Sequence, residues 1–231
     1  FACETYGIED PRITPIDGRF YITYVAVSPH GAATALASTS DFSSFEFHGL
    51  IFCPENKDVV LFPERIGGQY FALHRPTAAH DFSRPEIWLA SSPDLLHWGS
   101  HQPLLGSGAG WDRGRIGAGT PPIRTSAGWL VIYHGNNKAE AESGIGSYGA
   151  GMLLLDLDQP WKIRSSGAQI LAPEMEYERQ GFVPNVLFPT GIIQQGDSLL
   201  TYCGAADTAS CVLELGLADL LLSGSSPASF R

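Results

Sequence analysis

A short unit, in which a turn glycine leads into an aromatic or aliphatic strand, recurs four times along the 231-residue chain. The copies read DGRFYITYVAV (17–27), GGQYFALHRP (67–76), AGWLVIYHG (127–135) and GDSLLTYCGAAD (196–207). Their glycines, Gly18, Gly67, Gly128 and Gly196, are 49, 61 and 68 residues apart. Short β-branched or aromatic runs bounded by Gly, Pro or Asp are typical of β-strands.

A second strand follows each of the first three copies: TALASTSD (34–41), IWLASSPD (87–94) and GMLLLDLDQPW (151–161). In each of them an Asp follows the apolar run and begins a polar turn. We expect this turn to cap the strand and an aromatic residue, Phe45 or Trp98, to fold back onto the first two strands.

Repeats of about 40 to 50 residues built from four strands are typical of propeller blades. We therefore predict an all-β, β-propeller fold, with residues 1–231 forming a single catalytic domain. A β-sandwich with accidental similarity is the alternative, and the shared ASxxD endings favour the propeller. A short helix is expected only near 217–222. Aligning Tyr70 with Trp129 places Arg75 and His134 at the same blade position, where equivalent strands converge on one site.

Charge and composition exclude several function classes. The net charge of −10 argues against a nucleic-acid partner, because phosphate-backbone binding needs clustered Lys and Arg. The four cysteines show no CxxC pairing, so zinc ligation is poorly supported, and we expect no metal. The sequence has no run of 18 apolar residues and no visible signal peptide, so we expect no membrane span and a cytoplasmic location.

Glycoside cleavage usually needs two carboxylates, and the segment EDPR (9–12) supplies two acids beside a Pro and an Arg. These neighbours are able to set the pKa of Asp10. Taken alone the tetrapeptide is weak evidence, because most exposed acid pairs are merely solvated.

Six longer segments resemble glycoside hydrolase family 130, and they follow one another in the family's order. They are GIEDPRIT (7–14), KDVVLFPERIGGQYFALHRP (57–76), IGAGTPPI (116–123), GWLVIYHG (128–135), PEMEYERQGFVPNVLFPTG (173–191) and YCGAAD (202–207). The resemblance implies a five-bladed propeller and an inverting β-mannoside phosphorylase or β-mannosidase.

The resemblance also implies roles for single residues. Asp10 matches the family's general acid, which in the phosphorylases acts through a sugar hydroxyl. The positions of Lys57, Arg75, His134 and Tyr148 match phosphate ligands, and Asp207 matches a residue that holds the mannose ring. Arg12, Asn185, Phe188 and His80 are further candidates for contacts with the sugar.

A phosphate nucleophile is already anionic, so it needs a cluster of cations and hydroxyls rather than a second catalytic carboxylate. A hydrolase of this family is expected to carry glutamates at some phosphate positions, which here read Lys, Arg, His and Tyr. Phosphorolysis to mannose 1-phosphate with inverted configuration is therefore the prediction. Inorganic phosphate is the co-substrate, a β-mannoside oligosaccharide is the substrate, and no other cofactor is required.

Each candidate has an ordinary structural alternative. Lys57 suits a solvated position at a strand edge, and Arg75 suits a structural ion pair. His134 suits a buried core position, Tyr148 suits packing, and Asp207 suits the cap of a turn. At the level of the whole protein, the alternatives are a β-mannosidase of the same family and an inactive glycan-binding propeller. Family members carry roughly one further blade before EDPR, so we expect an N-terminally truncated chain. A homo-oligomer is compatible with the sequence.

Overall fold

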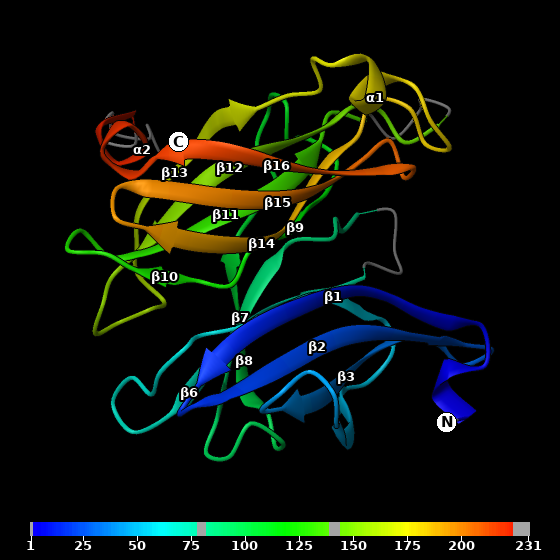
Figure 1. Ribbon diagram of the computed structural model, residues 1–231, viewed down its shortest axis with the longest axis vertical. Helices are drawn as coiled ribbons and strands as arrows, with labels where there is room; N and C mark the ends of the chain where they lie inside the picture. The colour runs from blue at the N-terminus through cyan, green and yellow to red at the C-terminus, as the bar shows by residue number, and fades with distance from the viewer. Residues whose placement is uncertain (1, 78–81, 139–143, 224–231) are drawn as a thin grey trace. The chain divides into compact units, whose positions relative to one another are not determined.

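The computed structural model describes residues 2–77, 82–138 and 144–223, and most of them lie in antiparallel β-sheets (Figure 1). The chain divides into two compact units, Phe1–Leu105 and Gly106–Arg231. Each unit contains two sheets, in which neighbouring strands follow one another in the chain, except that β9 pairs with β11. Because the connections are local, each sheet is assembled from one continuous stretch of sequence.

The first unit begins with a 3-10 helix, Ala2–Glu4, and continues into two four-stranded sheets. The first sheet contains β1 (Gly7–Ile16), β2 (Arg19–Ser28), β3 (Gly31–Thr39) and β4 (Glu46–Phe52). The second contains β5 (Asn56–Leu61), β6 (Tyr70–Pro76), β7 (Ile87–Ser92) and β8 (Gly99–Leu105). A shared apolar core, which includes Ile16 and Leu36 from the first sheet and Leu61 and Ala90 from the second, packs these sheets together.

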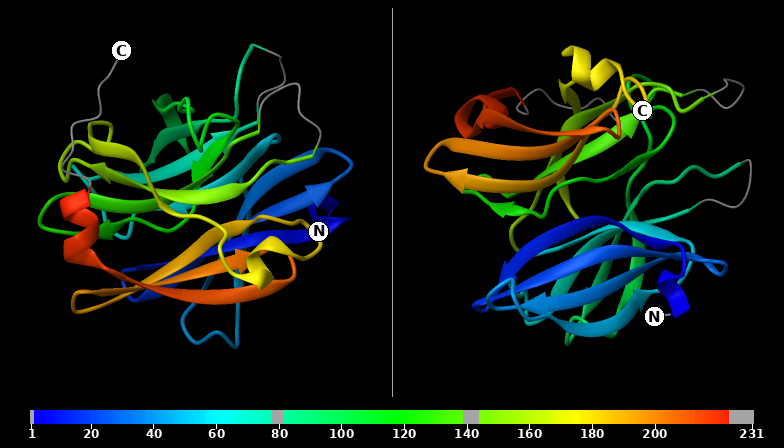
Figure 2. Two further views of the ribbon diagram at one scale, coloured as in Figure 1. Left: turned by 90° about the horizontal axis from the view of Figure 1, so that it is seen from above. Right: turned by 45° about the vertical axis from the view of Figure 1, so that its right-hand side comes forward.

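The second unit contains a five-stranded sheet and a three-stranded sheet. The larger one consists of β9 (Ile116–Ala118), β10 (Ile123–Arg124), β11 (Trp129–Asn136), β12 (Tyr148–Leu155) and β13 (Ile163–Leu171). The smaller one consists of β14 (Leu187–Gln195), β15 (Ser198–Ala205) and β16 (Ala209–Gly216). Two short helices complete the unit, α1 (Glu176–Arg179) before β14 and α2 (Leu217–Ser223) directly after β16 (Figure 2).

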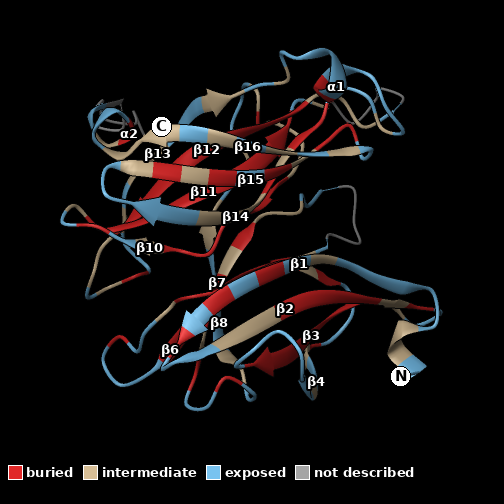
Figure 3. Cartoon of the chain, in the orientation of Figure 1, coloured by how far each residue is buried: buried red, intermediate tan, exposed pale blue. Residues whose placement is uncertain are grey.

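Burial follows the position of a strand within its sheet. Strands β3, β11 and β12 are buried along nearly their whole length, whereas β4 and β8, the last strands of their sheets, are largely exposed (Figure 3). Apolar runs such as WLVIYHG therefore occupy positions covered on both faces, where a continuous hydrophobic pattern is expected. Among the described residues, no helix combines the length and apolar character needed to span a membrane.

The four recurring segments form β2, β6, β11 and β15, as predicted, and the helix expected near 217–222 is α2. None of them is the first strand of its sheet, because an earlier strand precedes each of them. The turn glycine is the reason: Asp17 and Gly18 both have positive φ, as a two-residue hairpin turn requires, so the glycine joins β2 to β1.

The predicted aspartate turns are confirmed in three sheets. Asp41 accepts hydrogen bonds from the N–H groups of Ser43 and Ser44, Asp94 from those of Leu96 and His97, and Asp156 from those of Asp158 and Gln159. These donors stabilise the ionised carboxylate, and they lower the pKa of Asp41 to about 2.

The aromatic residues after these turns behave differently from each other. Trp98 folds back as predicted: its Nε1 donates to the Leu95 carbonyl at 2.9 Å, and its ring packs on Phe52. Phe45 does not fold back and remains 44% exposed. Phe42, whose ring lies 4.7 Å from that of Phe20, packs near this turn instead.

Candidate active site

Asp10 lies on a β-bulge in the first strand of the chain. Glu9 pairs with Val25 and Arg12 with Thr23, so the two residues between them oppose a single residue of β2. Asp10 has a φ of 51°, which is an uncommon backbone conformation for a residue other than glycine. A bulge interrupts the alternation of side chains and redirects the one at the bulge. Asp10 is half-buried, as an acid that meets a substrate needs to be.

Arg12 is held immediately beside the acid. Its side chain is 1% exposed, and its Nη1 donates to the Asp10 carbonyl at 2.6 Å. Its Nη2 lies 3.8 Å from Asp58 Oδ1. Burial lowers the pKa of the Arg12 guanidinium, and the negative charges of Asp58 and Asp10 oppose this shift. Arg12 therefore holds the backbone of the bulge from inside the unit, and its contact with the sugar stays a prediction.

Arg75 shares the same carboxylate. Its Nε lies 2.8 Å from Asp58 Oδ2, and both side chains are almost completely buried. Asp58 thus lies between two guanidinium groups that come from different strands, β1 and β6. Removing one member of such a buried set leaves uncompensated charge, so the three residues act as one structural unit.

Asp58 was not among the residues selected from the sequence, although a signal for it is present. Lys57 pairs with Arg75 and Val60 with Leu73, so Asp58 occupies a bulge on β5 like that of Asp10 on β1. Its φ of 55° is close to the 51° of Asp10. The dipeptides ED (9–10) and KD (57–58) are therefore equivalent in the two sheets, and aligning the first strands would have found Asp58.

Lys57 reaches the same region from the rim of the site. Its Nζ lies 3.3 Å from Glu9 Oε2, and its side chain is half-buried. Glu9 and Lys57 each precede the bulge of their own strand, so this pair bridges the two sheets. The structure thus brings Asp10, Arg12, Lys57 and Arg75 together around Asp58. These five residues are called the ionic cluster below.

His134, Tyr148 and Phe188 form a second group, in the second unit, and are called the aromatic trio below. The His134 ring centroid lies 4.2 Å from that of Phe188 and 6.0 Å from that of Tyr148. His134 is the sixth residue of β11, as Arg75 is of β6, so their predicted equivalence along the strand is confirmed. His134 is 0% exposed, and its contact with phosphate stays a prediction.

Asn185 and Asp207 lie at one end of the last sheet. The backbone N–H of Tyr148 donates to the Asn185 carbonyl at 2.9 Å, which ties the sugar candidate to the aromatic trio. Asn185 and Asp207 have φ values of 59° and 49°, and both are exposed. Asp207 lies in the short turn between β15 and β16, so the turn role and a sugar contact are compatible with this position.

Asp112, a buried acid of the second unit, was also not selected from the sequence. The Tyr133 hydroxyl donates to Asp112 Oδ2 at 3.1 Å, and burial raises the pKa of this carboxyl. Asp112 lies in the loop before β9, where the dipeptide WD carries no turn or repeat signal.

Two remaining predictions concern His80 and a metal. His80 lies outside the described residues. Within the residues that are described, no group of three or more His, Cys, Asp or Glu side chains is arranged to hold a metal ion.

Comparison with known proteins identifies the family. A family model described as beta-1,4-mannooligosaccharide phosphorylase, of glycoside hydrolase family 130, matches residues 1–222. A beta-1,2-mannobiose phosphorylase from Listeria innocua is 43% identical over 220 residues, which cover 94% of this chain and 60% of the relative. A 1,2-beta-oligomannan phosphorylase from a Thermoanaerobacter species is 37% identical, over 94% of this chain and 71% of the relative.

Solved structures agree on the fold. The structure of the Listeria innocua beta-1,2-mannobiose phosphorylase in complex with beta-1,2-mannobiose has a TM-score of 0.92 with this chain at 42% identity. That match covers 98% of this chain and 63% of the other. A family-43 glycoside hydrolase, at 16% identity and a TM-score of 0.61, shares the fold alone. The predicted all-β, β-propeller class is confirmed, with four successive sheets as its blades.

The chain spans about 60% of the length of the Listeria relative. Within that span the EDPR, GWLVIYHG and YCGAAD segments all lie inside the region that the family model matches. The chain belongs to glycoside hydrolase family 130.

Proposed function

We propose that this chain carries the site of an inverting β-mannoside phosphorylase, which transfers a mannosyl group from a β-mannoside to inorganic phosphate. The observation that carries the proposal is the ionic cluster, in which the bulged Asp10 lies beside the buried Arg12 and Arg12 shares Asp58 with a second buried guanidinium, that of Arg75. The names of the relatives support the same reaction, since those at 43% and 37% identity are both called phosphorylases.

In the proposed reaction a phosphate oxygen attacks C1 of the mannosyl unit from the face opposite the leaving group. The C1–O bond breaks, the leaving oxygen takes a proton that originates from Asp10, and α-mannose 1-phosphate forms. Following the family resemblance, the proton passes through a hydroxyl of the sugar. A single carboxyl is then sufficient, because phosphate supplies the negative charge that a general base would otherwise have to create.

The charges of the ionic cluster and Glu9 couple the protonation of Asp10 to the binding of phosphate. Three carboxylates and three cations make up this set: Glu9, Asp10, Arg12, Lys57, Asp58 and Arg75. Their formal net charge is zero when every carboxylate is ionised, and it is +1 when Asp10 is protonated. A phosphate anion therefore binds more favourably when Asp10 carries its proton. By the same linkage, bound phosphate raises the proton affinity of Asp10, which prepares it to act as an acid.

Five residues of the second unit keep, in this proposal, the roles that the family resemblance gives them. Phe188 has an aromatic face that suits a sugar ring, Asn185 and Asp207 have exposed polar groups, and His134 and Tyr148 match phosphate ligands. Both relatives reported above are named for β-1,2 linkages, so β-1,2-mannobiose is the first substrate to test.

Product analysis tests the proposal. The chain is incubated with β-1,2-mannobiose, with and without phosphate, and mannose 1-phosphate and free mannose are quantified. We expect mannose 1-phosphate only when phosphate is present, and a loss of turnover of about 10²-fold or more in Asp10→Asn. Asp94→Asn, which changes an acid in an exposed turn of the same unit, should retain activity.

Three results would count against the proposal. Free mannose released without phosphate would assign a hydrolase. Full activity of Asp10→Asn would remove the acid from its role. A folded chain that binds the sugar and forms neither product would be a glycan-binding protein.

A further inference from the structure

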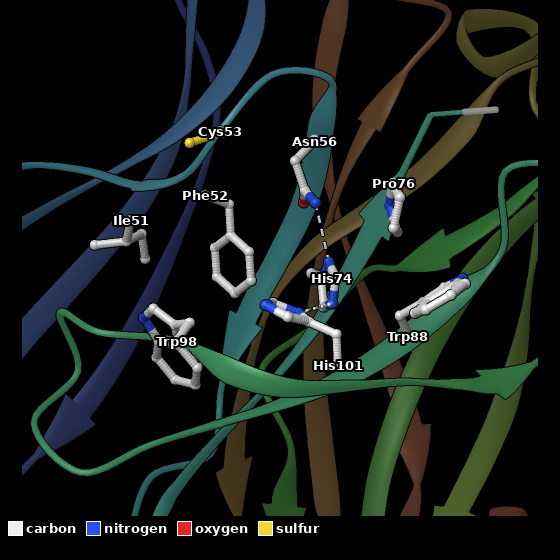
Figure 4. Close-up of a pocket in the computed structure, with 9 residues that line it drawn as sticks. All are labelled: Ile51, Phe52, Cys53, Asn56, His74, Pro76, Trp88, Trp98 and His101. Carbon is white, nitrogen blue, oxygen red and sulfur yellow. Dashed lines mark hydrogen bonds between the residues drawn. The ribbon is translucent and has the colours of Figure 1, made fainter. Parts of the chain in front are cut away.

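A pocket of about 490 Å³ opens on the first unit, and none of its lining residues belongs to the ionic cluster (Figure 4). Its walls come from the end of the first sheet and from all four strands of the second. The lining residues are Ile51, Phe52, Cys53, Asn56, His74, Pro76, Trp88, Trp98 and His101. Nothing in the proposed reaction uses these side chains.

His74 of the pocket and Arg75 of the ionic cluster lie on opposite faces of the second sheet. Consecutive residues of a strand point to opposite faces, and His74 and Arg75 are consecutive in β6. Arg75 Nε lies 2.8 Å from Asp58, whereas His74 Nδ1 lies 2.9 Å from Asn56 Nδ2. The pocket is therefore a separate site.

Aromatic rings form its apolar part. Phe52 packs on Trp98 and on His74, with ring centroids 5.5 and 4.7 Å apart. Trp88 closes the opposite side, and its ring centroid lies 6.4 Å from that of His74. Figure 4 shows the two tryptophans on either side of the imidazoles. Such a pocket offers flat surfaces that suit the C–H face of a pyranose ring.

The polar part is a chain of hydrogen bonds that ends at the surface. Asn56 Nδ2 donates to His74 Nδ1, which leaves the proton of this imidazole on Nε2. That Nε2–H donates to His101 Nδ1 at 3.2 Å, so His101, which is exposed, keeps its own proton on Nε2. The chain therefore orders the outermost imidazole as a hydrogen-bond donor for a ligand.

The buried part of the lining is electrically neutral. Burial lowers the pKa of His74 to about 3, so its imidazole is uncharged at neutral pH. The lining set contains no Lys, Arg, Asp or Glu side chain. An anion such as phosphate would find no counter-charge there, whereas a neutral polyhydroxylated ligand would find both flat apolar surfaces and ordered polar groups.

We infer that this pocket binds a neutral pyranose unit of a glycan, at a site distinct from the one where the bond is cleaved. The inference uses the geometry of the pocket and the membership of a carbohydrate-active family. It does not depend on whether the chain performs phosphorolysis or hydrolysis.

Binding is tested on the 231-residue chain with β-1,2-mannobiose and β-1,2-mannotriose in phosphate-free buffer. Saturation-transfer NMR measures the affinity, and mass spectrometry follows the alkylation of Cys53, which is exposed and lines the pocket. We expect either sugar to slow alkylation at Cys53 and to leave the rate at Cys3 unchanged. Asp10→Asn should retain this protection.

Two variants remove the proposed contacts. Trp88→Ala takes away one aromatic surface. His101→Ala removes the exposed donor and, with it, the acceptor of the His74 Nε2–H group. Each should weaken binding at least about tenfold, which corresponds to about 1.4 kcal/mol. Trp161→Ala changes a tryptophan of the second unit and serves as the matched control. Unfolding midpoints of the variants separate lost binding from lost structure.

A failure of the pocket inference can be told apart from a failure of the proposed reaction. Unchanged affinity and unchanged Cys53 protection in both pocket variants would overturn the inference, even if Asp10→Asn had lost turnover. The reverse result, an active Asp10→Asn in a chain whose Cys53 is still protected by sugar, would refute the proposed acid and support the pocket.

Discussion

The candidate residues of the first unit are held by buried ion pairs, and those of the second unit by packed rings. In the ionic cluster, Asp58 lies 2.8 Å from Arg75 and 3.8 Å from Arg12, with all three side chains buried. In the aromatic trio, His134 is in contact with Phe188 at 4.2 Å between ring centroids.

This difference separates two ways of preparing a site. Buried charges hold a geometry tightly, because any displacement leaves a charge without compensation in a medium of low dielectric. Packed rings hold it by contact area, which depends weakly on salt and pH. The first arrangement suits an anionic nucleophile, and in the second Phe188 offers a flat apolar face to a sugar. The variants below test whether the two units differ in this way.

Asp58→Ala should have the largest effect. It leaves Arg12 and Arg75 buried without their shared carboxylate, and we expect a loss of about 3–5 kcal/mol in the free energy of unfolding. Urea denaturation measures it. Glu46→Ala, which removes a carboxylate from the exposed pair with Arg19, is the control and should cost less than about 1 kcal/mol. A loss of similar size in both variants would show that Asp58 does not organise the cluster.

Acidification should destabilise the first unit through His74. Its pKa is lowered to about 3 in the folded chain, against an ordinary value of 6.5. The unfolded chain therefore binds more protons in this range, and stability is lost as the pH falls from 6.5 towards 3. The loss is about 2 kcal/mol between pH 6.5 and 4.5.

The difference in stability between the parent chain and His74→Gln, measured by urea denaturation at several pH values, isolates this contribution. His30→Gln changes an exposed imidazole of the same unit and should reproduce the pH dependence of the parent chain. If His74→Gln also did so, the buried imidazole would not be the group that titrates.

Phe188→Ala should cost about 2 kcal/mol, because the side chain is half-buried and its ring packs on His134 and Tyr148. The loss should be the same at low and high salt, since no charge is involved. Phe182→Ala, at a position that is 87% exposed in the same unit, should change little. A strong salt dependence of the Phe188→Ala effect would contradict the comparison of the two units.

Glu9→Gln should have the smallest effect. The pair with Lys57 is partly exposed, so we expect less than about 1 kcal/mol, and this difference should vanish near 1 M salt. Thermal unfolding at low and high salt measures it. An effect as large as that of Asp58→Ala would mean that the rim of the cluster is as well insulated from solvent as its centre.

Much of the fold was predictable because its signals are local. Hairpin glycines such as Gly18, apolar runs such as 129–134 and the turns capped by Asp41 and Asp94 act over a few residues. The strands before each turn were harder to place. Residues 7–16 contain Pro11 and Pro15 and a bulge at Asp10, and these interrupt the alternation that identifies a strand.

The candidate site was predictable to a lesser degree. Family motifs pointed to Asp10, Lys57 and Arg75, which the structure brings into one cluster. Asp58 escaped notice because its importance comes from contacts with residues 46 positions before it and 17 after it. The pocket beside His74 could not be foreseen either, because its lining comes from five strands and from the turns between them.

By itself, the sequence determined the β-strands and their hairpins, the caps of the turns, and the family. These depend on backbone preferences and on motifs that a short stretch of chain contains. Only the tertiary structure decided which charges share a carboxylate, which rings pack together, and which face of a strand lines a pocket. Those relations depend on burial and distance between strands, and the same residue types elsewhere in the chain would remain solvated.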